Sequence, residues 1–154
     1  MSVVARTVPI MTIPAVLSLV TLGVRDVAAA TRFYESLGFD LSSASVPGEV
    51  SFFRTAGGLL GLYGVDALAL DAQVPSAAHD GFRGVTLAIN VASRADVDSA
   101  IGTAAAAGAH VTKAPVSTDW GGYHGYFADP NGHLWEVAHN PFWPLGPDGV
   151  PLLP

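Results

Sequence analysis

The same order of predicted elements occurs twice along this chain, and the repeat constrains the fold more than any other feature of the sequence. In the first copy, the apolar stretch 16–24 predicts a buried strand, and Asp26 is a good N-cap for the helix that follows. Apolar residues then recur at helical spacing until Gly38, which ends the helix. Turn residues separate the next apolar stretches, which predict three further strands at 39–45, 49–55 and 59–63.

The second copy begins with the apolar stretch 85–91, which predicts another strand. Ser93 takes the place of Asp26 as the cap, and an Ala-rich helix over about 94–107 ends at Gly108. A strand at 109–113, a loop at 115–119 and a hairpin complete the copy. The chain therefore predicts an α+β fold of two βαβββ modules, whose sheets form an open, curved cup lined by every second strand residue.

The predicted modules set the domain boundaries. We expect a single domain at 15–139, with an N-terminal extension before it and a Pro-rich tail after it. The tail contains five prolines and the pair Phe142-Trp143, so we expect an extended segment that packs through its aromatic rings against its own domain or a partner subunit. The boundaries are 1–14 for the extension, about 15–64 for module 1, 65–83 for a linker with room for a helical turn around 66–70, 84–139 for module 2 and 140–154 for the tail.

Composition excludes several classes of function. Half of the 154 residues are hydrophobic and 13% are charged, which is typical of a compact globular protein. The net charge of −6, without a basic run, argues against nucleic acid or a membrane surface as a partner. The absence of cysteine excludes disulfides and thiolate chemistry. The apolar run 13–24 is too short to span a bilayer, so we expect a cytoplasmic protein.

The sequence Asp129-Pro130-Asn131-Gly132 is a strong tight-turn signal between two strands. If Gly132 adopts a left-handed conformation with a bulge, Tyr126 lies opposite Glu136. A plain four-residue loop would instead place Glu136 on the same face as Tyr123 and Phe127. We favour the bulged register, because glycine at the last turn position is what the bulge uses. In that register His124, Tyr126, Leu134, Glu136 and Ala138 share the cup face, while Gly125, Phe127, His133, Trp135 and Val137 share the other.

Two motifs resemble a known family. The first is Leu22-Gly23-Val24-Arg25-Asp26 followed by Phe33-Tyr34-Glu35-Ser36-Leu37-Gly38-Phe39, and the second is Gly125-Tyr126-Phe127-Ala128-Asp129-Pro130-Asn131-Gly132-His133-Leu134-Trp135-Glu136. Together they resemble the vicinal oxygen chelate superfamily, which includes glyoxalase I, bleomycin-resistance proteins, fosfomycin-resistance transferases and extradiol dioxygenases. The resemblance covers roughly 17–141. It implies two βαβββ modules around an open cup, and a homodimer.

The resemblance also implies four metal-ligand positions, which fall on Leu19, Leu62, Thr86 and Glu136. Only Glu136 is a good metal ligand, so we expect no cofactor. A divalent metal held by His124 and Glu136 is the alternative, because diagonal neighbours on adjacent strands can reach one ion.

These positions lead to three hypotheses for function. The first is a metal-independent protein that binds a small hydrophobic or aromatic molecule, as in natural-product sequestration and antibiotic resistance. The second is a metal-independent lyase, isomerase or cyclase with Glu136 as general base and His124 or Tyr126 as acid or oxyanion donor. The third is a metal-dependent glyoxalase or dioxygenase. The residues expected to contact the ligand are Leu19, Thr21, Leu62, Thr86, Asn90, Trp120 and Tyr123.

Overall fold

The computed structural model describes residues 13–76 and 81–154. Most of the predicted N-terminal extension, and His79 in the predicted linker, lie outside the described residues.

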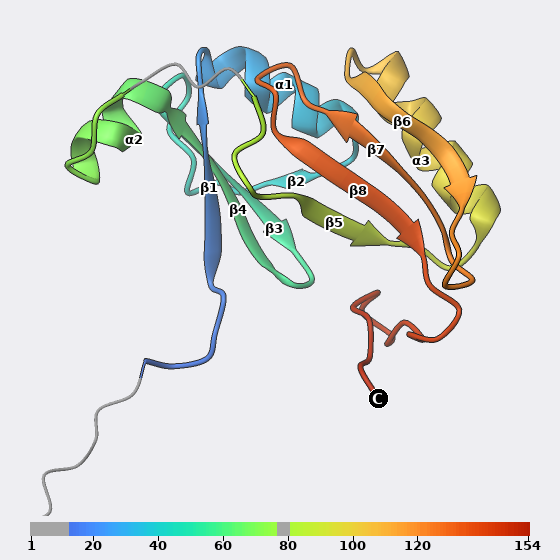
Figure 1. The fold of residues 1–154 in the computed structure, drawn as a ribbon. Coiled ribbons are helices and arrows are strands. Elements are labelled where there is room, and N and C mark those ends of the chain that lie inside the picture. Colours follow the sequence, from blue (N-terminus) through green and yellow to red (C-terminus); the bar gives the residue numbers. More distant parts are fainter. Residues whose placement is uncertain (1–12, 77–80) are drawn as a thin grey trace, which may run out of the picture.

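Module 1 has the predicted order of strand, helix and three strands (Figure 1). Its sheet has the order β1-β4-β3-β2, in which β1 pairs with β4 in parallel and β3 pairs with β4 antiparallel. Because β1 and β4 are parallel, α1 crosses over between them in sequence and packs on one face of the sheet. The elements are β1 (Leu19–Val24), α1 (Val27–Ser36), β2 (Asp40–Leu41), β3 (Val50–Thr55) and β4 (Gly58–Gly64).

Module 2 repeats this arrangement, with the sheet order β5-β8-β7-β6. A short helix, α2 (Val65–Asp71), leads out of module 1, so the single helical turn predicted in the linker is a helix of seven residues. The remaining elements are β5 (Leu87–Asn90), α3 (Arg94–Ala106), β6 (His110–Ser117), β7 (Tyr123–Ala128) and β8 (Leu134–His139). The two βαβββ modules predicted from the repeat are therefore confirmed.

The predicted caps position both crossover helices. The Asp26 side chain accepts a hydrogen bond from the backbone N–H of Ala29, and the Ser93 hydroxyl accepts one from the N–H of Asp96. Each satisfies a backbone donor that the first helical turn leaves unpaired. The glycines that follow the two helices both have positive φ, at 93° for Gly38 and 103° for Gly108.

Several strands differ from the prediction in length, and β1 and β5 are each three residues shorter than the predicted stretches 16–24 and 85–91. The stretch predicted as a strand at 39–45 forms only two residues of β2, because the chain turns back at Ser42, whose carbonyl accepts a hydrogen bond from Ser45. The loop predicted at 115–119 begins later, because β6 continues to Ser117. Pro115 fits in β6 because this is an outer strand and its pairing with β7 shifts register on both sides of Lys113.

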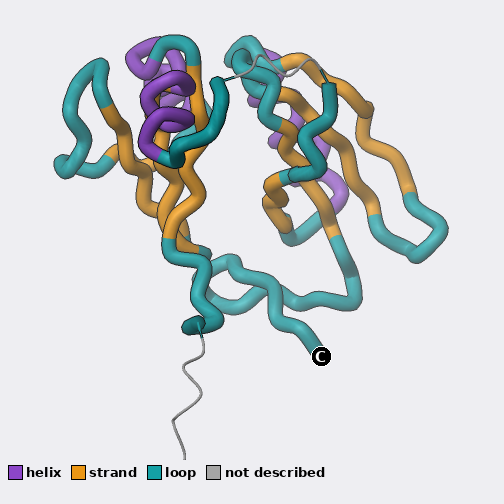
Figure 2. The backbone as a smooth tube through the Cα atoms, turned by 60° about the vertical axis from the view of Figure 1, so that its left-hand side comes forward, coloured by secondary structure: helices purple, strands orange, loops and turns teal. Residues whose placement is uncertain are grey.

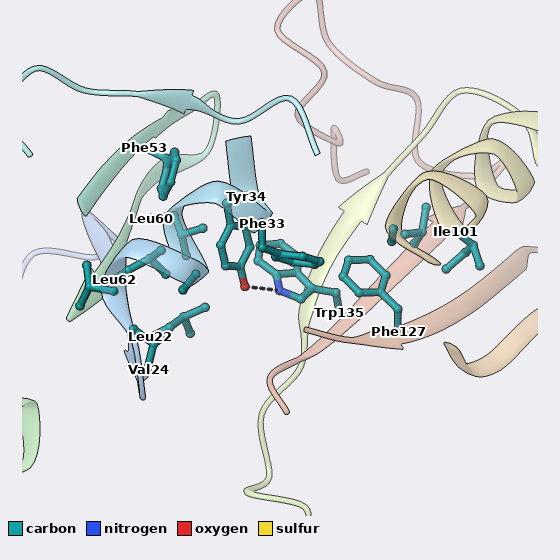
Figure 3. Close-up of a cluster of buried hydrophobic side chains, with 14 of the residues drawn as sticks. Leu22, Val24, Phe33, Tyr34, Phe53, Leu60, Leu62, Ile101, Phe127 and Trp135 are labelled. Carbon is teal, nitrogen blue, oxygen red and sulfur yellow. Dashed lines mark hydrogen bonds between the residues drawn. The ribbon is translucent and has the colours of Figure 1, made fainter. Parts of the chain in front are cut away.

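The two modules share one hydrophobic core on the sides of the sheets that carry helices (Figure 3). Tyr34 of α1 lies between them, with its ring centroid 5.9 Å from that of Phe53 in β3 and 6.1 Å from that of Trp135 in β8. The Trp135 indole N–H donates to the Tyr34 hydroxyl at 3.1 Å, which in turn donates to Asp129 at 2.7 Å. Burial raises the pKa of the Tyr34 hydroxyl far above its usual value, so this group stays a donor.

The C-terminal segment runs below both groups of strands in Figure 2. It folds back on itself instead of staying extended as predicted, through a turn at Gly146–Gly149 and a bridge between Leu145 and Pro151. Within residues 13–76 and 81–154, no helix has the length and hydropathy needed to cross a membrane.

Candidate functional site

The β7–β8 hairpin has the bulged register predicted from its turn. The Gly132 backbone has φ 87°, its N–H donates to the Asp129 carbonyl, and the Asp129 N–H donates to the His133 carbonyl. Tyr126 pairs with Glu136, as predicted. This register turns Phe127, Trp135 and Val137 into the core and leaves the alternate residues on the face away from α3, which we call the open face of module 2.

Cross-strand pairing arranges the open face of module 2 in two rows. One row runs from β5 to β6 through Ala88, Glu136, Tyr126 and Lys113, and the other through Asn90, Ala138, His124 and Val116. His124 is therefore a diagonal neighbour of both Glu136 and Lys113. Long side chains at diagonal positions of a sheet can reach each other.

His124 connects a carboxylate to an ammonium group on this face. Its Nδ1 lies 2.6 Å from Oε1 of Glu136, and its Nε2 lies 2.9 Å from Nζ of Lys113. A lysine ammonium only donates, so Nε2 accepts from Lys113, and Nδ1 carries the proton and donates to Glu136. The exposed fractions of the His124 and Glu136 side chains are 13% and 23%, so the pair is largely shielded from water. The Glu136 carboxylate is thus held by His124.

Two aromatic side chains flank this polar chain. The Tyr126 ring lies 5.3 Å from the His124 ring, and burial together with the adjacent Glu136 carboxylate raises the pKa of the Tyr126 hydroxyl. The Trp120 ring meets the His124 ring edge-on at 6.4 Å and remains 47% exposed. Trp120 also covers Gly122, since a Cβ added there would lie 1.8 Å from an indole carbon. The predicted residues His124, Tyr126, Glu136 and Trp120 are therefore brought together.

Lys113 is the residue of this cluster that sequence reasoning missed. It is the only lysine in the chain and lies in a stretch predicted as a strand. These two facts could have identified it as a candidate site residue. Its place on the open face could not be read from alternation, because β6 shifts register between Val111 and Lys113.

The other predicted ligand residues on open faces lie apart from this cluster. Leu19 and Thr21 are on the face of β1 opposite the buried Leu22 and Val24, in the other module. Thr86 and Asn90 line a separate pocket of about 430 Å³ at the β5 edge, which is partly covered by residues 149–151 of the C-terminal segment.

The structure places two predicted site residues on the opposite faces of their sheets. Leu62 is fully buried in the core beside Leu22, because β4 alternates so that Leu60 and Leu62 face α1. Tyr123 faces α3, where its hydroxyl donates to Asp98 at 2.8 Å and its ring lies 5.3 Å below the Arg94 guanidinium. The expectation that Leu62 lines the cup was therefore wrong, and Tyr123, which was expected to contact the ligand from a loop at the cavity rim, instead begins β7 and faces α3.

Comparison with known proteins identifies the family of this chain. The model of the glyoxalase/bleomycin resistance protein/dioxygenase superfamily matches residues 16–137. The chain belongs to this superfamily. A glyoxalase-related enzyme from Fulvimarina pelagi is 33% identical over 90% of this chain and 98% of its own, with a TM-score of 0.80. A family enzyme from Burkholderia phytofirmans PsJN is 25% identical over 81% of this chain and 98% of its own, with a TM-score of 0.73. Comparison with curated proteins found no match.

Strand pairing identifies the positions of the two modules that correspond to each other. Thr21 and Ala88 lie at the same distance before their helix caps, and they pair with Gly61 and Glu136. Gly61, not Leu62, is therefore the module 1 counterpart of Glu136. Neither glycine nor leucine has a side-chain metal ligand, so the expectation that this position cannot bind a metal is the same for Gly61 as for Leu62.

The donor set does not fit a metal ion at these positions. Leu19 and Gly61 offer no ligand, and the Thr86 hydroxyl is a weak one. Within the described parts of the chain, no group of three or more histidine or carboxylate side chains could hold a metal. His124, the remaining candidate, already uses one nitrogen on Glu136 and the other on Lys113.

Proposed function

We propose that this protein binds a small, flat hydrophobic or aromatic molecule on the open face of module 2, without a metal ion. The observation that carries this proposal is the polar chain from Lys113 through His124 to Glu136, flanked by the rings of Trp120 and Tyr126. Aromatic walls bury a large area at little cost in side-chain entropy, while a few fixed polar groups orient a ligand. The superfamily includes bleomycin resistance proteins, so sequestration of a natural product is consistent with this use.

Binding by this wall can be tested with paired tryptophan variants. Isothermal titration with 2-naphthamide, a flat neutral probe, should give a heat of binding for the unaltered protein. Trp120→Ala and Tyr126→Ala should each weaken binding about tenfold, or about 1.4 kcal/mol, because each removes an aromatic contact with the probe. Trp143→Ala, which removes a half-exposed indole from the C-terminal segment, is the control and should leave affinity unchanged. Loss of affinity in Trp143→Ala alone would contradict a binding site on the open face of module 2.

A second candidate is acid–base catalysis by Glu136, as in a lyase, isomerase or cyclase. The 2.6 Å hydrogen bond from His124 favours this candidate, because it orients the carboxylate on a largely shielded face. The step would be removal of a proton from an acidic C–H of the substrate by Glu136. The electron pair left behind would be held as an enolate, with the Tyr126 hydroxyl as an available donor.

Glu136→Gln separates the two candidates, because it keeps the shape of the side chain and removes the base. For a binding protein, affinity for 2-naphthamide should change by less than about tenfold. For an enzyme, deuterium exchange at the acidic C–H of 2-tetralone in D₂O should be accelerated by the unaltered protein and fall by about a hundredfold in the variant. No acceleration by the unaltered protein counts against the catalytic candidate.

Elemental analysis of the purified protein tests the metal-free part of the proposal. We expect transition metal well below one equivalent per chain, because the equivalent positions lack ligands. One equivalent that disappears in Glu136→Ala would contradict the proposal.

A further inference from the structure

Within the part of the chain that the structure describes, Lys113 is a cation without a carboxylate partner, and it lies at the edge of the candidate site. Among residues 13–76 and 81–154, the ion pairs are Arg54 with Asp40, His124 with Glu136, and His133 with Asp129. Lys113 donates to the neutral nitrogen of His124, which satisfies one of the three N–H donors of its ammonium. The side chain is exposed, so the remaining donors are available to a ligand.

The surroundings of Lys113 are those of a site for an aromatic group. Its Nζ lies 5.9 Å from the Tyr126 ring centroid, and the half-exposed Trp120 ring lies 6.4 Å from the ring of His124, which accepts the lysine hydrogen bond. His124 therefore contacts the ammonium through Nε2 at 2.9 Å and lies within 6.4 Å of both aromatic rings. A flat ring that contacts Tyr126 therefore has room to bring a substituent close to the ammonium.

The negative charge of Glu136 is separated from Lys113 by the His124 ring. Its carboxylate accepts the His124 Nδ1 proton, and its side chain is less exposed than Lys113. A ligand that approaches from solvent therefore meets the ammonium before the carboxylate. A charge-assisted hydrogen bond from the Lys113 ammonium to an anionic oxygen is stronger than a hydrogen bond to a neutral oxygen.

We propose that Lys113 makes the site selective for aromatic anions, with a carboxylate or phenolate oxygen of the ligand bound to its ammonium. This inference rests on the proposed function, since it names the class of ligand for the same open face. It assigns a specificity role to a residue that lies outside the motifs that identify the superfamily.

The test compares two probes of one shape, 2-naphthoate and the neutral 2-naphthamide, by isothermal titration. The unaltered protein should bind 2-naphthoate at least about tenfold more tightly than 2-naphthamide, and Lys113→Met should abolish this preference because it weakens binding of the anion far more than binding of the neutral probe. Lys113→Arg keeps the positive charge and should retain a preference. Arg54→Met is the matched control, because it removes a cation from module 1 and should leave the preference intact.

The single lysine gives an independent measurement. Acetylation by an N-hydroxysuccinimide ester, read by mass spectrometry, modifies only one ε-amine in this chain. Saturating 2-naphthoate should slow modification of Lys113 several-fold more than saturating 2-naphthamide does.

Three outcomes would overturn the inference. Equal affinity of the unaltered protein for the two probes, or an unchanged preference in Lys113→Met, contradicts the role of Lys113 but leaves the proposed function standing, since 2-naphthamide still binds. If neither probe binds, both the role of Lys113 and the proposed function are contradicted.

Discussion

At the residue scale, the candidate site depends on a position where the chain has no side chain. Gly122 is buried beneath the Trp120 indole, which approaches it closely enough to exclude a Cβ. The Gly122 N–H also donates to the Thr118 hydroxyl, which holds the loop that carries Trp120. This contact could not be predicted from the sequence, because it depends on the tertiary position of the indole.

We expect Gly122→Ala to displace the Trp120 ring, because the added Cβ would lie 1.8 Å from an indole carbon. The ring is the far end of a flexible side chain, so it can move with little loss in the free energy of unfolding. The substitution should therefore change the near-ultraviolet circular dichroism and weaken binding of 2-naphthamide. Gly102→Ala in α3 is the control, since nothing lies within 4 Å of the added methyl. That control should stabilise the helix by about 0.5–1 kcal/mol. An unchanged spectrum for Gly122→Ala would contradict the contact.

At the scale of elements, turn chemistry made the β7–β8 hairpin predictable, and the register followed from one glycine. The sequence therefore placed His124, Tyr126 and Glu136 on one face correctly. Strand β6 was less predictable, because its two register shifts depend on how it packs against β7 and leave no period in the sequence. Leu62 was misplaced for a related reason, since a mostly apolar strand such as β4 has no alternation to show which residues face the core.

Gly132→Ala should lower the free energy of unfolding by about 1 kcal/mol, because an alanine at φ 87° is strained. Nothing lies within 4 Å of an added Cβ at this position, so the loss comes from the backbone alone. Urea denaturation measures it, again with Gly102→Ala as the control. A variant as stable as the unaltered protein would argue against the bulged turn.

At the scale of the whole molecule, a buried polar network joins the two modules. Asp129 lies at the start of the β7–β8 turn and accepts hydrogen bonds from Tyr34 of module 1 and from His133. Burial alone would raise the pKa of the Asp129 carboxyl, but the hydrogen bond and charge of His133 and the bond from Tyr34 outweigh it and hold the pKa below its usual value.

Stability should therefore fall in acid. The folded-state pKa of Asp129 lies below the unfolded value of about 3.9, so its contribution is present above that pH and is lost as pH falls through the lower, folded pKa. Urea denaturation should show less stability below about pH 4. Asp129→Asn should be less stable at pH 7 and should lose part of this dependence on pH, whereas Asp40→Asn, which changes an exposed ion pair, should keep it. Equal slopes in both variants would contradict the assignment.

We also expect a homodimer, because large apolar side chains are exposed near both ends of the described chain. They include Leu17 at 72%, Phe142 at 67% and Trp143 at 40% exposure. Light scattering at micromolar concentration should give twice the chain mass of 15.8 kDa. A monomer under those conditions would contradict this expectation.

The interrupted outer strand β6 has a consequence for how molecules of this protein can associate. A regular edge strand offers a row of free N–H and C=O groups, onto which a strand from another molecule can add, and that is a common route to aggregation. In β6 the row is broken, because Pro115 has no N–H and the two register shifts turn neighbouring groups out of line. Continuous strand addition is therefore disfavoured at this edge, so self-association that involves it must use side chains. The register shifts that made the position of Lys113 unpredictable thus also make the β6 edge of the sheet a poor template for aggregation.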